Sequence, residues 1–158
     1  DAMDHDTRAM LGRAIELAVA NVAAGGGPFG AVVVTRDGRA FEGVNRVTRD
    51  NDPTAHAEVV AIREACRELG TFDLTGATLY ASCEPCPMCL ATSLWARVAA
   101  VHYAADRHAA AAAGFGDAAF YDFIAGKDRS LMRVVHTRHG DALAPFAAWE
   151  RYERRVEY

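Results

Sequence analysis

The amino-acid sequence has 158 residues, a length that suits one compact domain. Hydrophobic residues make up 51% and charged residues 24% of the chain, which is ordinary for a globular protein and argues against disorder. The formal net charge is −4, whereas a general nucleic-acid binder usually presents a basic surface. We therefore expect a single domain over residues 1–158 and do not expect nucleic acid as its partner.

The first half of the chain is predicted to form two helices and a hairpin. Apolar residues recur at helical spacing over 7–24, and a glycine-rich run ends this helix. Two strands, 30–35 and 40–44, are joined by an Asp-Gly pair that is typical of tight hairpin turns. After a polar loop, a second helix is predicted over 54–69, with glycine directly after its end.

The second half of the chain is predicted to alternate short strands and helices. The strands are expected over 78–81, 99–103 and 132–137, and the helices over 87–95, 118–124 and 145–155. Strands that alternate with helices usually form one sheet with crossover helices on both faces. The sequence therefore predicts an α/β sandwich with one hairpin in its sheet.

The cysteines indicate the kind of chemistry. Three of the four cysteines, Cys83, Cys86 and Cys89, lie within seven residues. We see no secretory leader pattern and no stretch long enough to span a bilayer, so we expect a cytoplasmic location and no membrane partner. Thiols stay reduced in that compartment, and a cluster of them there indicates metal or redox chemistry rather than disulfides.

Two short motifs, H-A-E and, about thirty residues later, P-C-P-M-C, carry the strongest chemical signal. Cys86 and Cys89 are three residues apart, so at a helix start their sulfur atoms share one face. With His56 they make three protein ligands, which leaves the fourth tetrahedral position of a zinc ion for water. Glu58 can take a proton from that water, whose pKa zinc lowers to about 7. We therefore predict one catalytic Zn²⁺ per subunit, with Glu58 as the proton shuttle.

Three other kinds of site could use the same residues and are compared with the catalytic zinc site. A redox Cys-x-x-Cys pair would leave His56 and Glu58 without a task. A closed structural zinc site would add Cys83 to the three ligands and exclude the water. A bacterial iron–sulfur run would need cysteine where the chain has Ser93, so that site is excluded. We treat Cys83 as a neighbour of the metal rather than a ligand.

The paired motifs are typical of zinc nucleobase deaminases, and the sequence resembles the cytidine-deaminase superfamily and, within it, the bacterial guanine deaminases. The resemblance covers nearly the whole chain. It rests on segments at 27–32, 45, 51–58, 82–89, 95–97, 113–117, 145–149 and 157–158. The Asn-Asp-Pro-Thr sequence before the first motif and the Glu-Tyr ending are what favour the guanine branch.

The resemblance implies a fold and an assembly. The fold is a three-layer α/β/α sandwich of the cytidine-deaminase type, with a mixed five-stranded central sheet. The assembly is a homodimer in which the C-terminal segment, about 141–158, is exchanged. One subunit's tail would then close the other subunit's site.

The resemblance also implies roles for individual residues. It places zinc on His56, Cys86 and Cys89, with Glu58 moving protons. Asp117 would accept hydrogen bonds from the N1–H and 2-amino groups of guanine, which an ionised carboxylate can do. The residues expected to contact the substrate are Phe29, Asn45, Ala57, Trp95, Asp117 and Tyr158.

One position departs from the family pattern. Guanine deaminases of this type carry a second glutamate shortly before the Pro-Phe-x-x-Trp segment, where it assists proton transfer. Here that place holds Asp141, whose side chain is one methylene shorter. Either Asp141 serves as the second catalytic carboxylate with altered geometry, or the substrate preference has moved.

These features together predict zinc-dependent hydrolytic deamination of a free nucleobase, with guanine to xanthine and ammonia as the favoured reaction. A cytosine or amino-triazine (ammeline-like) deaminase would use the same groups. A tRNA adenosine deaminase shares the motifs, but the net charge of −4 speaks against a bulky polyanion. In a zinc-stabilised scaffold without catalysis, Glu58 would have no task.

Overall fold

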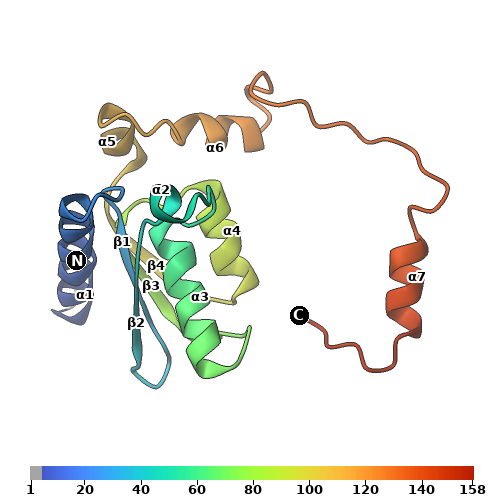
Figure 1. The fold of residues 1–158 in the computed structure, drawn as a ribbon, viewed down its shortest axis with the longest axis horizontal. Coiled ribbons are helices and arrows are strands. Elements are labelled where there is room, and N and C mark those ends of the chain that lie inside the picture. Colours follow the sequence, from blue (N-terminus) through green and yellow to red (C-terminus); the bar gives the residue numbers. More distant parts are fainter. Residues whose placement is uncertain (1–4) are drawn as a thin grey trace.

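The computed structural model describes residues 5–158 (Figure 1). The order of its elements follows the predicted order as far as β4, except that the short helix α2 lies in the predicted polar loop; after β4, three helices follow one another without the predicted strand. The helices are α1 (His5–Ala23), α2 (Val47–Asp50), α3 (Ala57–Leu69), α4 (Pro87–Trp95), α5 (Arg107–Ala112), α6 (Ala118–Ile124) and α7 (Ala144–Arg151). The strands are β1 (Gly30–Val34), β2 (Ala40–Val44), β3 (Thr78–Cys83) and β4 (Ala100–Ala105).

The strands form one mixed sheet in the order β2-β1-β3-β4. Strand β1 is antiparallel to β2 and to β3, whereas β3 and β4 are parallel. The parallel pair is joined through α4, as a crossover connection requires. The α/β class and the mixed sheet predicted from the sequence are thus confirmed.

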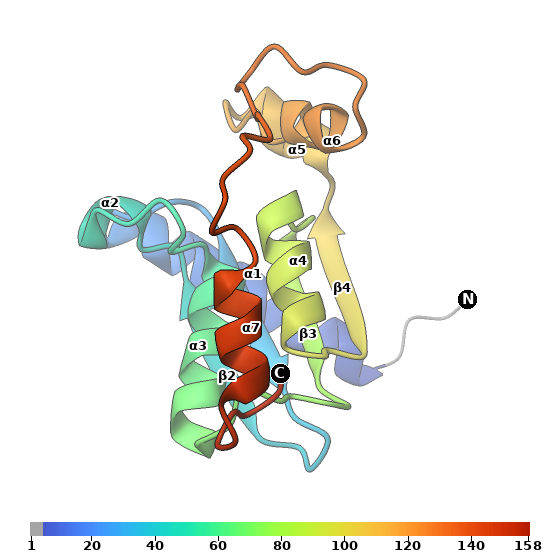
Figure 2. The same ribbon diagram turned by 90° about the vertical axis from the view of Figure 1, so that its right-hand side faces the viewer.

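Two glycines allow helices to pack closely on opposite faces of this sheet. Residues 31 and 43 are paired in the register and share a face, so Gly30 points to the other one. A Cβ atom at Gly30 would lie 2.3 Å from the backbone oxygen of Ala14 in α1. A Cβ atom at Gly43 would lie 2.3 Å from the backbone oxygen of Ala57 in α3. Helix α1 therefore covers one face and α3 the other, with α4 beside α3 (Figure 2).

The predicted fifth strand, 132–137, is wrong: within residues 5–158 the sheet has four strands, and this segment is irregular. A strand needs a neighbour for its backbone hydrogen bonds. The segment instead leaves the sheet toward α7, and its apolar side chains are exposed, Val134 by 69% and Val135 by 62% (Figure 1). Its β-branched residues favour a strand, but no strand among residues 5–158 pairs with it.

The core between the sheet and α3 is built mainly from small side chains. Its buried cluster comprises Ala31, Val33, Ala57, Ala61, Ile62, Ala65, Leu74, Ala77, Leu79 and Ala96. Alanine on both sides lets the helix backbone approach the strands closely, so the start of α3 has little freedom to move. In the described part of the chain, no helix is long and apolar enough to cross a membrane.

The close approach at Gly43 makes a testable prediction. The methyl group of Gly43→Ala would meet the backbone of α3, so the free energy of unfolding should fall by about 1–3 kcal/mol. Gly12 in α1 has no atom within 4 Å of an added Cβ, so Gly12→Ala should instead raise stability by up to about 1 kcal/mol. Urea denaturation of the two variants measures both changes. A Gly43→Ala protein as stable as the parent would contradict this packing.

Candidate metal centre and its pocket

Three side chains meet where α3 and α4 begin. The Nδ1 atom of His56 lies 3.6 Å from Cys86 Sγ and 3.4 Å from Cys89 Sγ. The two sulfur atoms are 3.6 Å apart. Zinc bonds of about 2.3 Å to sulfur and 2.0–2.1 Å to nitrogen require separations of about 3.5–3.8 Å on a tetrahedral face. The three ligand atoms therefore fit a zinc ion that has a fourth, open position.

The backbone explains why these residues converge. His56 and Cys86 are the N-cap residues of α3 and α4, both with extended backbone and neither with a side-chain capping bond. Pro87 occupies the first turn of α4, where its missing N–H has no cost. Each side chain is therefore free to turn toward the metal. Both helix N-termini add positive potential, which favours thiolates.

The ligands are electrostatically prepared for a cation. The hydrogen bond between the two sulfur atoms lowers the pKa of Cys86 to about 4 and raises the pKa of Cys89. The Cys86 thiolate, as a hydrogen-bond partner, in turn raises the pKa of His56. The three metal ligands thus hold negative charge in a largely buried position. A divalent cation bound there would stabilise that charge.

Glu58 lies in the first turn of α3 with 7% of its surface exposed, and it lines the same cavity as His56 and Cys86. Burial raises its pKa above the ordinary glutamate value. A raised pKa makes a carboxylate a stronger base, which favours its part in general acid–base catalysis. Its place beside the ligands, without joining the metal-binding group of the described residues, suits a proton shuttle.

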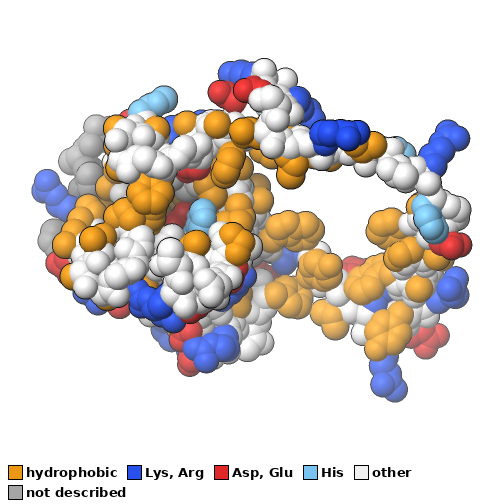
Figure 3. Space-filling model, turned by 45° about the horizontal axis from the view of Figure 1, so that its top comes forward, with side chains coloured by type: hydrophobic (Ala, Val, Ile, Leu, Met, Phe, Trp, Pro, Cys, Tyr) orange, Lys and Arg blue, Asp and Glu red, His pale blue; other side chains and the backbone are white. Residues whose placement is uncertain are grey.

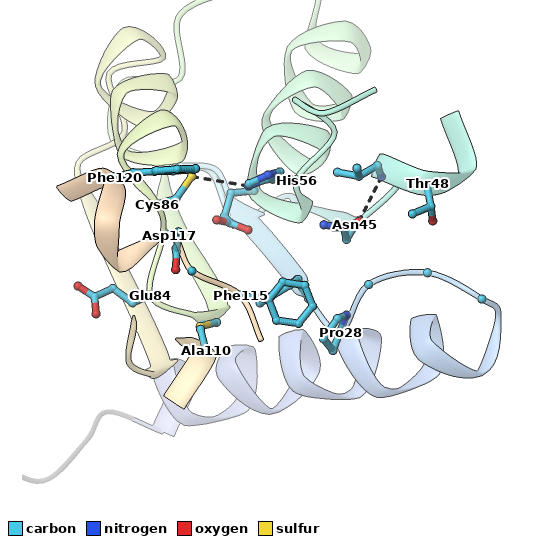
Figure 4. A pocket seen from close by; sticks show the side chains of 18 residues that line it. Pro28, Asn45, Thr48, His56, Glu84, Cys86, Ala110, Phe115, Asp117 and Phe120 are labelled. Atoms are coloured by element: carbon cyan, nitrogen blue, oxygen red, sulfur yellow. Dashed lines mark hydrogen bonds between the residues drawn. The ribbon is translucent and has the colours of Figure 1, made fainter. Parts of the chain in front are cut away.

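The cavity in front of the metal centre has a volume of about 630 Å³, within the usual range for small-molecule sites. Figure 4 shows Asn45 and Asp117 on different sides of it, with His56 and Phe115 between them. Of the residues predicted from the sequence, the structure places six on the wall of the cavity. These are Phe29, Asn45, His56, Glu58, Cys86 and Asp117, and Cys89 completes the metal-binding group.

Asn45 is held so that it offers a donor. Its Oδ1 accepts a hydrogen bond from the backbone N–H of Val47 at 3.1 Å, which leaves the Nδ2 hydrogens for a ligand (Figure 4). The buried Asn21 in α1 supports this place by donating to the backbone oxygens of Asn45 and Gly27, at 2.9 and 2.8 Å. A Cβ at Gly27 would lie 2.9 Å from Asn45 Cγ, so only glycine fits there.

Asp117, the N-cap residue of α6, offers acceptors. Its Oδ1 is buried and has no hydrogen-bond partner among the described residues. Burial also raises the pKa of its carboxyl group. A buried polar atom without a partner is costly, and a ligand N–H directed at it would remove that cost.

Aromatic rings flank the space between these two groups. Phe29 and Phe115 are in edge-to-face contact with ring centroids 4.8 Å apart, and Phe120 also lines the cavity. The sequence reasoning assigned no role to Phe115 or Phe120. Phe120 lies three residues after Asp117, so helical spacing could have placed both on one face of α6.

Four of the predicted site residues, Ala57, Trp95, Asp141 and Tyr158, neither line the cavity nor belong to the metal-binding group. Trp95 is at the far end of α4 from Cys86 and is 67% exposed, and its ring contacts Tyr158 at a centroid distance of 5.9 Å. Asp141 is exposed in the segment before α7. Ala57 is fully buried as the first residue of α3 and does not line the cavity.

Comparison with known proteins decides the family. Residues 4–105 match the cytidine and deoxycytidylate deaminase zinc-binding region. The chain belongs to this deaminase family. It is 49% identical to the guanine deaminase of Bacillus subtilis, over 99% of this chain and the whole of that protein. It is 32% identical to the tRNA-specific adenosine deaminase of Haemophilus influenzae, over 94% of this chain and 87% of that protein.

Solved structures of guanine deaminases support the same family assignment. The B. subtilis guanine deaminase structure superposes with a TM-score of 0.90 at 48% identity, over 99% of both chains. The guanine deaminase structure from Nitrosomonas europaea superposes with a TM-score of 0.65 at 37% identity, over 69% of this chain and 64% of that one. This deaminase is therefore a zinc-dependent hydrolytic enzyme, and the zinc ligands available to it are His56, Cys86 and Cys89.

Because the fourth position of the zinc site is open, substitution of Cys83 and substitution of Cys86 should have different effects on zinc content. Cys83 lies outside the metal-binding group, its thiol contacts the backbone oxygen of Asp106, and burial raises its pKa to about 11. Purified Cys83→Ser should retain about one zinc per chain, whereas Cys86→Ser should lose most of it. Elemental analysis after dialysis measures both contents. Loss of zinc from Cys83→Ser would show that the site is closed by a fourth protein ligand.

Proposed function

We propose that this deaminase converts guanine to xanthine and ammonia. The observation that carries the proposal is that Asp117, whose buried Oδ1 has no hydrogen-bond partner among residues 5–158, lines the same cavity as Asn45, whose Oδ1 already accepts a hydrogen bond from the Val47 N–H. The similarity to the B. subtilis guanine deaminase over 99% of this chain supports the same substrate.

The polar groups of the cavity match the edges of guanine. Its N1–H and 2-amino group are donors, which suit the carboxylate of Asp117, and its O6 and N7 are acceptors, which suit the amide hydrogens of Asn45. The flat faces of the base suit the ring of Phe115, since base–aromatic stacking contributes about 1–3 kcal/mol. Neutral cytosine presents an acceptor at its N3, which would leave Asp117 facing a like group.

The chain's own residues then perform the proton transfers. Zinc held by His56, Cys86 and Cys89 would supply an activated water and polarise the reacting centre. Glu58 would take a proton from the water as its oxygen adds to C2, and would deliver that proton to a ring nitrogen. It would then take the remaining proton from the new C2 hydroxyl and pass it to the amino group, so that the C2=O bond forms as the C2–N bond breaks and ammonia leaves. Asp117 and Asn45 hold the base so that C2 faces the metal, and the aromatic walls exclude bulk water.

Substitution of the proton shuttle tests this reaction. Glu58→Gln keeps the shape but cannot accept a proton, so guanine turnover should fall by about 10²–10⁴-fold or more while zinc content stays unchanged. Ammonia release should be compared for guanine, cytosine, ammeline, adenine and tRNA. We expect guanine to be the preferred substrate of the parent enzyme. Faster turnover of cytosine or ammeline would instead indicate that the substrate preference has moved, as the aspartate at position 141 allows. Activity retained by Glu58→Gln would refute the mechanism.

We further propose a homodimer of single-domain chains, 1–158, that exchange the segment 141–158. Helix α7 stands apart from the sheet, and its apolar side chains Phe146 and Trp149 are 65% and 39% exposed (Figure 1). Figure 3 shows hydrophobic side chains gathered on this separated part. Exposed apolar surface of this extent is typical of an interface.

The exchange would also bring Trp95, Asp141 and Tyr158, which lie away from the cavity of their own chain, to the cavity of the partner. Helix α4 is about 13 Å long, and Trp95 lies at the end opposite the metal ligands. Trp95, Tyr158 and Asp141 can therefore serve a neighbouring chain's pocket more readily than their own. This leaves Asp141 in the role of a second catalytic carboxylate and Tyr158 in that of a closing side chain, both contributed by the partner.

Mixed dimers test the exchange. Glu58→Gln chains and chains lacking Tyr158 should each be nearly inactive alone. If the tail acts on the partner, a mixed dimer contains one complete site, so unfolding and refolding the two together should restore roughly a quarter of the parent activity. Activity that stays at the level of the separate variants would show that each tail serves its own chain or none.

We also propose a cytoplasmic location, because all four cysteines are free and the metal site needs two of them reduced.

A further inference from the structure

Residues 107–124, which comprise α5, α6 and the loop between them, form a cap over the metal centre. The cap contributes Ala110, Phe115, Asp117 and Phe120 to the cavity wall. It has little packing of its own: Ala110 is buried in α5, and every residue of α6 is at least partly exposed. Hydrophobic burial therefore contributes little to its position, and other contacts must hold it over the metal.

The first of these contacts is an ion pair between Glu84 and Arg107. Glu84 Oε1 accepts a hydrogen bond from the backbone N–H of Arg107 at 2.9 Å. Its Oε2 accepts two more from the guanidinium group, at 2.9 and 3.2 Å. The Glu84 side chain is only 12% exposed and that of Arg107 is 32% exposed, so the pair is partly shielded from water, and its three hydrogen bonds define its geometry, unlike an ordinary surface pair.

The second contact joins the other end of the cap to the same loop. The guanidinium carbon of Arg107 lies 3.6 Å from the centre of the Tyr121 ring, a stacking geometry that favours arginine over lysine. The Tyr121 hydroxyl donates a hydrogen bond to the backbone oxygen of Pro85. Burial raises the pKa of Tyr121 to about 12, so this hydroxyl keeps its proton at neutral pH.

These contacts form a closed ring through Glu84, Arg107, Tyr121 and Pro85, directly before the ligand Cys86. The ring ties the first residue of α5 and the middle of α6 to the loop that carries a metal ligand. Asp117 lies between the two attachment points, one turn before Tyr121. The ring therefore sets the distance between the metal centre and the acceptor that recognises the substrate.

We propose that Arg107 is a positioning residue that determines how the substrate is bound, through its hold on the cap and Asp117. It neither contacts the reacting atoms nor holds the metal. Loss of the ring should loosen the cap and weaken binding of the base, while the zinc site keeps its geometry because His56, Cys86 and Cys89 lie outside the cap. The inference rests on the proposed function for its substrate probe, but not for its structural readout.

The test compares Arg107→Ala with Arg107→Lys and with a control, Arg67→Ala. Arg67 also pairs with a glutamate, Glu64, but is 71% exposed and far from the cavity. Amide hydrogen exchange should become faster over 107–124 in Arg107→Ala, with α1 and α3 still protected and zinc content unchanged. Its KM for guanine should rise about 10-fold or more with kcat within about threefold. Arg107→Lys keeps the positive charge but loses the paired guanidinium hydrogen bonds to Glu84 and the stacking on Tyr121, so its exchange rate and KM should be intermediate. Arg67→Ala should match the parent in both.

Several outcomes would overturn the proposal. Unchanged exchange over 107–124 in Arg107→Ala would show that the ring does not hold the cap. Faster exchange throughout the chain would show a general structural role. A fall in kcat at constant KM would place Arg107 at the chemical step. If the parent prefers another base, the proposed function fails separately, and the KM comparison is then made with that base while the exchange result still applies.

Discussion

The meeting of two helix N-termini at one end of the sheet is the constraint on which the rest of the structure depends. His56 and Cys86 cap α3 and α4, and Cys89 completes the first turn of α4, so three metal-binding atoms converge without long loops. The glycine at position 43 and the alanines of the core let α3 sit close to the strands, which fixes one half of the site. The same helix turn buries Glu58, whose raised pKa follows from that burial. Fold, metal binding and proton transfer thus depend on the same few residues.

The two polar groups that we propose to recognise the substrate lie outside the metal-binding group, and one of them lies in a weakly packed segment. Asn45 is held by the core of the molecule, through the Val47 N–H and the buried Asn21. Asp117 is carried by the cap, which polar contacts attach to the metal-ligand loop. In the proposed function, the donor on the core and the acceptor on the cap hold opposite edges of the base. The same division explains why a change at Arg107 should affect binding without removing the metal.

The sequence was sufficient for the parts of the site that depend on local geometry. The spacing of Cys86 and Cys89, with a proline between them at a helix start, specifies one face, and the paired motif identifies the chemistry. Helix α5 was missed because its alanine-rich run has no amphipathic period, although Asp106 caps it by accepting from the N–H groups of His108 and Ala109. The strand over 132–137 was wrongly predicted because its pattern is that of a strand while its partner is absent from the chain's own sheet. The sequence also placed Trp95, Asp141 and Tyr158 at the site, whereas the structure of the single chain puts none of them on the cavity.

Zinc X-ray absorption spectroscopy on the purified enzyme tests the central claim most directly, because it counts the atoms bound to the metal. With His56, Cys86 and Cys89 as the protein ligands and an open fourth position, the spectrum should fit two sulfur atoms at about 2.3 Å and two nitrogen or oxygen atoms at about 2.0–2.1 Å. A fit that requires three sulfur atoms would mean that Cys83 closes the site, and it would contradict the assignment of an activated water and with it the catalytic role of Glu58.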